Sequence, residues 1–378
     1  MKRRYCTSTR DRIPPMRLLV TVTFNPNQLR SHLEPIAAIP EVEEIILVTD
    51  RRPPPMPKLR VVVPRWFLSR LFGRAFAKLL VLSVLARRLR PDWVIGFNLV
   101  PHGLNAVLSA RLIHSRSVYV MIGGPIEWEG GGWASDNRLL SRLGRRSPLL
   151  ERLLLAGARR ATLVVTMGSR GREALLARGF EATRVVPIPA SVDEGRLQSR
   201  GVPPTWDAIT VAELIPRKRI ADLIEAVALL APDWPELRIA IAGTGPLLAE
   251  LQEHARRLGV ENHVEFLGFR EDVADLYSRS RVFVLPSRYE GLSISLLDAM
   301  ASGLPAVVSD VGEASDVIRH GDNGFLYPPG DIVELSQRLS ELLDDEGLSH
   351  ELGQRAARDA QAHAGTSTVA AAYRRILT

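Results

Sequence analysis

The chain has 378 residues, of which 46% are hydrophobic and 24% are charged, and it contains a single cysteine, Cys6. This length and composition fit a soluble globular protein of two domains, exclude a disulfide framework and favour a reducing compartment. Because no apolar run reaches the ~18 residues of a membrane span, we expect a cytoplasmic protein.

The formal net charge of +7 hides a difference between the two halves of the chain. Residues 1–200 contain 33 Lys and Arg against 15 Asp and Glu, whereas residues 201–378 contain 16 against 27. A first half with a formal charge of +18 suggests an anionic partner, such as a membrane lipid, a nucleic acid or an acidic substrate. A solvated arginine-rich surface without such a partner is the alternative.

Residues 1–15 are basic but lack the apolar region of a secretory signal, so we expect a disordered N-terminal extension. From Met16 onward, short runs of apolar and β-branched residues alternate with helix-length segments, which predicts βαβ units and a parallel sheet. The expected strands are 17–24, 44–49, 60–66, 91–98, 118–124 and 161–168, and the expected helices include 66–89 and 148–160.

The helix predicted at 66–89 is both basic and amphipathic. It can lie on an anionic membrane interface, or it can pack an apolar stripe on its own sheet with the arginines in water. Both alternatives stay open. The apolar side chains are Trp66, Phe67, Leu71, Phe72, Phe76, Leu79 and Leu80, and the basic ones are Arg65, Arg70, Arg74, Lys78, Arg87 and Arg88.

The alternation of strands and helices resumes after a polar, proline-containing segment at 191–204, which we interpret as an interdomain linker. The expected strands are 207–214, 237–243, 263–269, 282–286 and 305–310, and the expected helices are 219–231, 246–258, 331–345 and 347–361. This pattern predicts an α/β protein with two Rossmann-like doubly wound domains that face a central cleft. The domains span 16–190 and 205–360, and residues 361–378 form a helix that can return to the N-terminal domain.

The segment 290–312 carries the clearest sign of a ligand site. A buried strand at 282–285 leads to Glu290 and Gly291, and a helix then opens at Leu292 and Ser293. Open α/β sheets bind nucleotides beyond the carboxyl end of a strand, and helix N-termini suit phosphates. Because a carboxylate can hold sugar hydroxyls, this segment predicts a nucleotide-sugar site.

The second half resembles the C-terminal domain of the retaining glycosyltransferases of family 4, which are group 1 glycosyl transferases with the GT-B architecture. The resemblance runs through VAELIPRKRIADLIEA, IAGTGPLLAELQ, VEFLGFREDVADLYSRS, EGLSISLLDAMASGLPAVVSD and VIRHGDNGFLYPPGD, over about 205–345. It implies transfer of a hexose-type sugar from a nucleoside-diphosphate sugar to a hydroxyl acceptor, with retention. No Asp-x-Asp metal motif is present, so we expect no metal and no cofactor besides the nucleotide-sugar co-substrate.

The resemblance also implies roles for single residues. Glu290 contacts the donor sugar, Asp298 binds the ribose where the family has a longer glutamate, and Lys218 contacts the diphosphate. Glu213 stands where an arginine is common, which removes one positive contact. The other implied donor-binding residues are Gly243 and Gly245 in the GTGP turn, Phe269 and Arg270 at the nucleobase, and Gly291, Leu292 and Ser293 at the diphosphate.

The first half follows the family pattern less closely, because loop 24–28 lacks the usual glycine pair. Asn98 stands where the family often has a histidine, and His102 follows one turn later, so both are catalytic candidates. The acceptor-side candidates are Gly123, Gly124, Glu127 and Glu129, and the glycines at 130–132 suggest a mobile loop over the cleft.

The basic first half favours a lipid-linked or otherwise anionic acceptor and a peripheral contact with an anionic membrane. That setting fits synthesis of cell-envelope or extracellular polysaccharide or glycolipid. One alternative is a nucleotide-sugar epimerase or hydrolase on the same scaffold, and another is a catalytically silent relative. A nucleic-acid-binding protein is a third, but the sequence offers no aromatic stacking platform, so no nucleic acid is expected.

Overall fold

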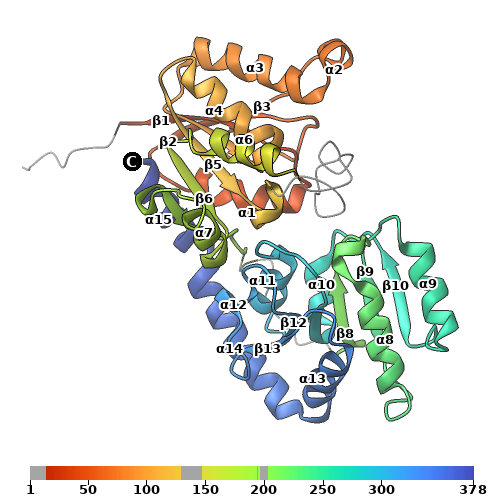
Figure 1. Cartoon of the computed structure of the whole chain (residues 1–378). Coiled ribbons are helices and arrows are strands. Elements are labelled where there is room, and N and C mark those ends of the chain that lie inside the picture. The colour runs from red at the N-terminus through yellow and green to blue at the C-terminus, as the bar shows by residue number, and fades with distance from the viewer. Residues whose placement is uncertain (1–13, 129–146, 194, 196–202) are drawn as a thin grey trace, which may run out of the picture.

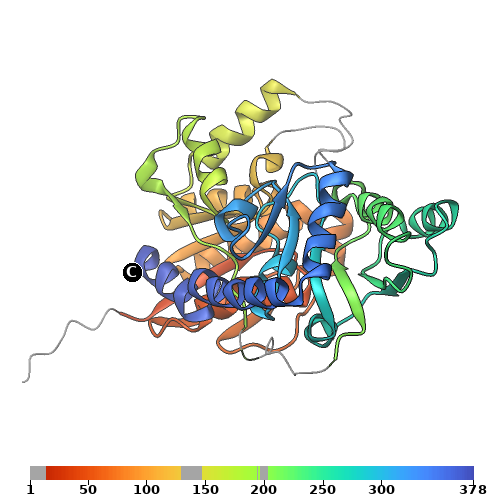
Figure 2. The same ribbon diagram turned by 90° about the horizontal axis from the view of Figure 1, so that it is seen from below.

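The computed structural model describes residues 14–128, 147–193, 195 and 203–378. These residues form two α/β domains, each a parallel sheet with helices on both faces (Figures 1 and 2). The expected pair of doubly wound domains is therefore confirmed.

The N-terminal sheet contains seven strands among the described residues, in the order β3-β2-β1-β4-β5-β6-β7, and all pairs are parallel. The central strands are buried at almost every position, as is typical of a sheet covered on both faces. Along the chain the strands are β1 (Met16–Thr21), β2 (Val42–Val48), β3 (Leu59–Val62), β4 (Trp93–Phe97), β5 (Arg116–Met121), β6 (Leu163–Thr166) and β7 (Val185–Pro187).

The helices of the N-terminal domain divide between the two faces of this sheet. One face packs against α3 (Arg74–Leu89), α4 (Leu104–Arg111), α6 (Pro148–Ala158) and α7 (Ser169–Leu176). The other packs against α1 (Pro26–Ala37) and α15 (Thr366–Leu377), the last helix of the chain. The shorter helical segments are α2 (Trp66–Phe72), η1 (Leu99–Gly103), η2 (Gly124–Glu127) and η4 (Ala182–Arg184).

The segment expected as one helix at 66–89 forms two helices, α2 and α3, which meet at Gly73. This residue has φ 77° and ψ 156°, a backbone conformation that is essentially restricted to glycine. As a result α2 buries none of its residues, while α3 buries a stripe that includes Ala77 and Leu82.

The C-terminal sheet contains six parallel strands among the described residues, in the order β10-β9-β8-β11-β12-β13. The strands are β8 (Trp206–Val211), β9 (Ile239–Ala242), β10 (Val264–Gly268), β11 (Ser280–Leu285), β12 (Ala306–Ser309) and β13 (Gly324–Tyr327). One face packs against α8 (Ile220–Leu230), α9 (Leu248–Arg257) and α13 (Ile332–Asp344). The other packs against α10 (Val273–Ser278), α11 (Ile294–Ala301), α12 (Ala314–Val317) and α14 (Glu346–Ala364), and η5 (Pro216–Lys218) precedes α8.

The chain passes between the domains twice, and the two passages are bonded to each other. The backbone N–H of Val192, on the first passage, donates to the carbonyl of Ala364 at the end of α14, at 2.9 Å. The hydroxyl of Thr366, at the start of α15, donates to the carbonyl of Val192 at 3.0 Å. Beyond this point α15 packs on the N-terminal domain, where Trp93 Nε1 donates to the carbonyl of Leu377 at 2.9 Å.

A second contact between the domains lies at the start of α7. The carboxylate of Glu313, from the C-terminal domain, accepts hydrogen bonds from the backbone N–H groups of Arg170 at 2.9 Å and Gly171 at 2.7 Å. Asp316 accepts from the backbone N–H of Ser169 at 2.5 Å. Two carboxylates of one domain thus bond the positive end of a helix of the other.

Candidate active site

A pocket of about 740 Å³ lies between the carboxyl ends of the two sheets. The N-terminal domain contributes the loops after β1, β4 and β5, and the C-terminal domain contributes the loops after β8, β9, β10 and β11. The pocket therefore lies where doubly wound sheets bind ligands. Every described site residue expected from the sequence lines it, with the exception of Gly124, which lies beside the carbonyl of Glu290.

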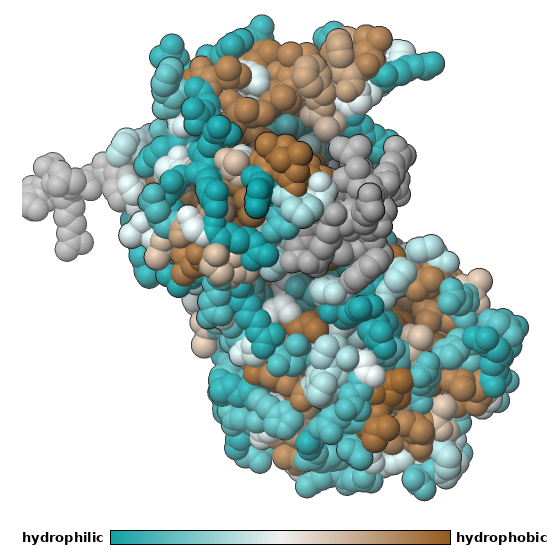
Figure 3. All heavy atoms as spheres, in the orientation of Figure 1, coloured by the Kyte–Doolittle hydropathy of each residue, from teal (hydrophilic) through white to brown (hydrophobic). Residues whose placement is uncertain are grey.

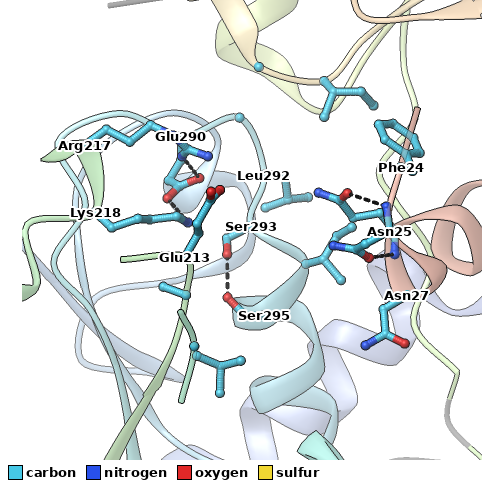
Figure 4. Close-up of a pocket in the computed structure, with 18 of the residues that line it drawn as sticks. Phe24, Asn25, Asn27, Glu213, Arg217, Lys218, Glu290, Leu292, Ser293 and Ser295 are labelled. Carbon is cyan, nitrogen blue, oxygen red and sulfur yellow. Dashed lines mark hydrogen bonds and ion pairs between the residues drawn. The ribbon is translucent and has the colours of Figure 1, made fainter. Parts of the chain in front are cut away.

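Glu290 is the centre of a buried charge cluster in this pocket (Figure 4). Its Oε1 accepts hydrogen bonds from Lys218 Nζ at 2.5 Å and from Ser287 Oγ at 2.6 Å, and its Oε2 accepts from Arg217 Nη1 at 3.2 Å. Burial raises the pKa of the Glu290 carboxyl, but the charges of Lys218 and Arg217 outweigh it and lower the pKa below its ordinary value. The cluster therefore holds an ionised carboxylate.

The cations of this cluster come from the short helix η5, which follows β8. Its first residue, Pro216, suits a helix start, and the turn brings both Arg217 and Lys218 to Glu290. Glu213 also lines the pocket, and Figure 4 shows its side chain directed to the same region as Glu290. Of the two arginines that flank Lys218, Arg217 contacts Glu290, whereas Arg219 bonds Asp222 at 2.6 Å.

The first turn of α11 faces the pocket beside this cluster. Ser293, at the N-cap, makes no side-chain hydrogen bond to the amides of its own helix, and its hydroxyl lies 2.9 Å from that of Ser295 (Figure 4). Amides at a helix start that are not capped by a side chain suit a phosphate. Leu292 and Ser293 therefore lie where the diphosphate site was expected.

Asp298 is half-buried one turn further along α11 and lines the same pocket. Burial together with the charge of Asp298 raises the pKa of Tyr277 well above its ordinary value. The wall expected at the nucleobase contains Phe269, whose side chain is 65% exposed. Arg270 beside it forms a forked pair with Asp272 at 2.8 and 2.5 Å, so its charge is already compensated.

The two glycines of the GTGP turn are required by the protein's own backbone. A Cβ at Gly243 would lie 1.8 Å from the carbonyl oxygen of Ala212, and one at Gly245 would lie 2.3 Å from that of Leu214. Gly291 makes a similar contact across the domain boundary, where a Cβ would lie 1.8 Å from the carbonyl oxygen of Ile122. These glycines bring the pocket loops together as well as leaving room for a ligand.

His102 and Asn98 both lie on the N-terminal wall of the pocket. Burial lowers the pKa of His102 to about 3, so the ring is neutral, and its Nδ1 is 2.9 Å from Thr21 Oγ1. Asn98 has φ 61° and ψ 142°, which lies outside the left-handed helical region and is a strained conformation for any residue other than glycine.

Glu127 lines the pocket, but its carboxylate is not available to an acceptor hydroxyl as expected. Oε1 accepts from the backbone N–H groups of Ile122 and Gly123, each at 2.7 Å. Oε2 accepts from the backbone N–H of Leu99 and from Tyr119 Oη, each at 2.6 Å. With two bonds on each oxygen, this buried carboxylate ties the loops after β4 and β5 together.

Two expectations for the same segment lie outside the described residues, namely Glu129 and the glycines at 130–132. Among the residues that the structure describes, no group of three or more His, Cys, Asp or Glu side chains is placed to hold a metal ion.

Three polar residues beside the pocket were not expected as site residues. Lys78 Nζ, on α3, donates to Asp50 Oδ2 at 2.6 Å and to Thr23 Oγ1 at 2.7 Å, and Thr23 lines the pocket. The Lys78 side chain is only 4% exposed, although it was counted among the basic side chains of an amphipathic helix. The position of Asp50, directly after a strand, is the signal that could have indicated this cluster.

His32 on α1 also lines the pocket and was not expected there. Its ring lies 5.3 Å from both Phe24 and Phe97, and neither ring nitrogen has a hydrogen-bond partner among the described residues. Burial lowers its pKa to about 3, so the ring is neutral.

Comparison with known proteins agrees with this geometry. Residues 198–359 match the family described as Glycosyl transferases group 1. An exopolysaccharide phosphotransferase of Streptomyces coelicolor is 33% identical over 195 residues, which cover 51% of this chain and 20% of that protein. The N-acetyl-alpha-D-glucosaminyl L-malate synthase of Bacillus anthracis is 34% identical over 139 residues, which cover 37% and 36%. The chain thus spans well under half the length of either relative.

Among solved structures, HepE of Anabaena in complex with UDP and glucose superposes with a TM-score of 0.76 at 19% identity. The superposition covers 96% of this chain and 99% of HepE, so the likeness extends over both domains and concerns the fold. Residues 198–359 therefore carry the sequence pattern of the group 1 glycosyl transferases, in a chain that has the two-domain GT-B fold.

Proposed function

We propose that the protein is a glycosyltransferase that moves a hexose-type sugar from a nucleoside-diphosphate sugar to a hydroxyl acceptor, with retention of the anomeric configuration. The observation that carries the proposal is the buried Glu290 carboxylate beside Lys218 and Arg217, at the mouth of α11. A carboxylate suits sugar hydroxyls, while cations and a helix start suit a diphosphate. All of these groups lie in one pocket at the carboxyl ends of parallel strands.

In the proposed reaction, the bond between the anomeric carbon and the diphosphate oxygen breaks. A bond between that carbon and the acceptor oxygen forms on the same face, and the acceptor proton passes to the leaving diphosphate. Lys218 and the first amides of α11 stabilise the charge that develops on the diphosphate. Glu290 holds the sugar and Asp298 holds the ribose, so catalysis depends on positioning and electrostatics. Because Lys218 and Arg217 already oppose the diphosphate charge, we propose that transfer needs no metal ion.

The comparisons with known proteins indicate which donor to test first and in which biosynthetic process the protein would act. The UDP and glucose bound to HepE support a UDP-sugar as the first donor to test. The name of the Streptomyces relative supports a place in the synthesis of cell-envelope or extracellular polysaccharide or glycolipid. We propose a lipid-linked or anionic acceptor, and a peripheral position at the inner face of the cytoplasmic membrane. No helix in the described parts of the chain combines the length and the apolar character of a bilayer-crossing segment.

A thermal-shift screen against UDP, GDP and ADP, with and without their sugars, tests donor binding. A ligand of the native state raises the apparent stability, by about 2.7 kcal/mol at 100 times its Kd. One nucleotide should shift the melting temperature of the wild-type protein, and its sugar should shift it further. Glu290→Gln should keep most of the nucleotide shift and lose the sugar increment. Absence of any nucleotide shift would overturn the proposed function.

A product assay separates the proposal from its rivals. An epimerase or hydrolase would consume the nucleotide sugar without an acceptor, whereas a transferase forms a glycoside whose anomeric configuration NMR can report. A nucleic-acid-binding protein would retain generic DNA at moderate salt and ignore the nucleotide sugars.

A further inference from the structure

One face of the N-terminal domain exposes many large apolar side chains. Eleven of the sixteen such side chains exposed in the described part of the chain lie on α2, α3, α4 with its C-cap, and α6. The most exposed are Trp66 at 73%, Leu71 at 72%, Leu149 at 69% and Leu153 at 61%. Figure 3 shows apolar atoms gathered over α2 and α3 at the top of the molecule and again over α6. We call this surface the α2–α6 face.

The helices of this face bury only some of their apolar residues against the sheet, and the others are exposed. On α3 the buried stripe contains Ala77, Leu82 and Ala86, whereas Phe76 and Leu80, four residues apart, point outward. The short helix α2 buries none of its residues. The sequence left two alternatives open for residues 66–89. Packing of an apolar stripe on the sheet accounts only for the buried residues of α3, and it leaves the exposed apolar residues of α2 and α3 unexplained. Exposed apolar surface of this extent marks an interaction site.

The charges on the α2–α6 face are almost all positive. The exposed cations on these helices are Arg70, Arg74, Arg87, Arg88, Arg111 and Arg152. Glu151 is the only acidic residue in the four helices, all of which are described, and it pairs with Arg178 at 3.3 Å. Apolar and aromatic side chains among arginines match an anionic lipid surface, where rings enter the headgroup layer and guanidinium groups meet phosphates.

We propose that the α2–α6 face docks the protein on an anionic membrane. A second copy of the chain is a poorer occupant, because a symmetric interface would bring the same arginines of both copies together. The membrane supplies both an apolar layer and the opposite charge, so it complements the two properties of this face at once.

The position of Lys78 relates this face to the pocket. Phe76 points outward, while Lys78 is buried two residues later and bonds Thr23, which lines the pocket, at 2.7 Å. A helix with its side chains is roughly 10 Å wide, so docking through α3 holds the acceptor wall of the pocket about one helix width from the lipid. This step rests on the proposed function, and it makes a membrane lipid headgroup the acceptor class.

The test is flotation of the purified full-length protein with vesicles of phosphatidylcholine alone or mixed with phosphatidylglycerol. The protein should float with the mixed vesicles at low salt, less at high salt, and little with phosphatidylcholine alone. The double variant L71S/F72S should reduce the bound fraction about tenfold, because each buried apolar side chain contributes. Since α2 buries none of its residues, the variant should keep its fold. L229S/V333S, at exposed apolar positions of the C-terminal domain, should float like the wild type.

A second pair of double variants tests the contribution of the positive charges. R70Q/R74Q should weaken binding to the mixed vesicles about tenfold or more, since each cation near an anionic surface contributes appreciably. R256Q/R257Q, at exposed positions of α9, should bind the mixed vesicles like the wild type. The proposal would be overturned if each variant and its control lost vesicle binding equally. It would also be overturned if the protein bound neutral vesicles as well as the mixed ones, or bound neither. A dimer that L71S/F72S abolishes, or DNA binding that depends on the same arginines, would overturn it as well.

The outcome is distinguishable from that of the proposed function. Vesicle binding without any nucleotide shift would leave the docking surface standing and overturn the transferase. Nucleotide-dependent shifts of the melting temperature without vesicle binding would support the transferase and overturn the docking surface.

Discussion

At the scale of single residues, the pocket holds opposite charges at close range before any substrate arrives. Glu290 is bonded by Lys218, Arg217 and Ser287. Removing one partner of a buried ion pair is costly, because the remaining charge stays buried without compensation. In the proposed function, a bound donor would therefore compete with Glu290 for the same two cations.

The first prediction concerns Glu290→Gln, which keeps the size of the side chain and removes its charge. We expect kcat/KM for sugar transfer to fall about 100-fold or more, because the amide can neither hold the sugar hydroxyls as strongly nor orient the cations. Steady-state kinetics with the nucleotide sugar found in the screen measures this. Glu253→Gln, an exposed change in the same domain, should have no effect. Full activity of E290Q would disprove the site assignment.

A second prediction follows from the buried neutral histidines, His32 and His102, whose pKa values are both lowered to about 3. The unfolded chain binds more protons than the folded one between pH ~6.5 and ~3, so the free energy of unfolding decreases as the pH falls through this window. Each histidine contributes about 1.4 kcal/mol per pH unit.

His32→Phe isolates one of these contributions, since the ring lies between two phenylalanines and its nitrogens have no described partner. Between pH 7.5 and pH 5, the variant should lose about 2 kcal/mol less stability than the wild type in urea unfolding. His350→Gln, at an exposed position, should follow the wild type. Identical pH profiles for H32F and the wild type would contradict the prediction.

At the scale of elements, the junction at Gly73 separates a helix that packs on the sheet from one that does not. A Cβ at Gly73 would meet no atom within 4 Å, so the requirement for glycine comes from the backbone conformation alone. This junction decides the direction in which α2 presents its apolar side chains.

The third prediction is therefore that Gly73→Ala destabilises the junction. Residues forced into this region of φ and ψ cost of the order of 1–3 kcal/mol, which urea unfolding would detect. Reorientation of α2 should also weaken vesicle binding. Ser69→Ala, within α2, keeps helical backbone angles and should alter neither property. A G73A protein as stable as the wild type, with unchanged vesicle binding, would show that α2 is not held by this residue.

Elements were predictable from the sequence where hydrophobic runs are long and regular. The strands β1, β4, β8 and β11 and the helix α11 were expected, whereas β7 and β13 were not. Both missed strands are short, with three and four residues, and they lie among prolines and glycines that indicate turns. The break at Gly73 was also missed, since an isolated glycine in a helical pattern is often tolerated.

Side chains near the pocket were predictable only where a motif surrounds them. Glu290 and Lys218 lie in such motifs, and both line the pocket. Glu127 and Lys78 were interpreted as solvent- or substrate-facing, because the sequence does not show that Glu127 meets four donors or that Lys78 reaches Asp50. Those contacts join segments distant in sequence and depend on the packing of the whole domain.

At the scale of the whole molecule, the two domains are in close backbone contact at Gly291. Gly291 approaches the backbone of Ile122 so closely that no larger residue fits in this arrangement. The contact belongs to the same loops that carry Glu290 and the N-terminal wall of the pocket, so the distance between the two walls of the pocket depends on it.

The fourth prediction uses this contact. In Gly291→Ala the added Cβ would lie 1.8 Å from a carbonyl oxygen of the other domain, so the domains must move apart. We expect kcat/KM to fall about 100-fold, since misplacement by 1 Å can cost that much. The melting temperature should change little, because Gly291 lies in a loop and the substitution leaves the packing of both sheets intact. Gly347→Ala, away from the cleft on α14, is the control. An active G291A enzyme would mean that catalysis does not use this arrangement.

The bonded pair of chain passages at Val192 and Ala364 has a mechanical consequence. Because the two crossings are hydrogen-bonded to each other, we expect any relative motion of the domains to be mainly a rotation about this point. We expect opening of the cleft to be such a rotation, which requires the hydrogen bonds from α7 to Glu313 and Asp316 to break. The two walls of the pocket would therefore face each other in the same arrangement after each opening.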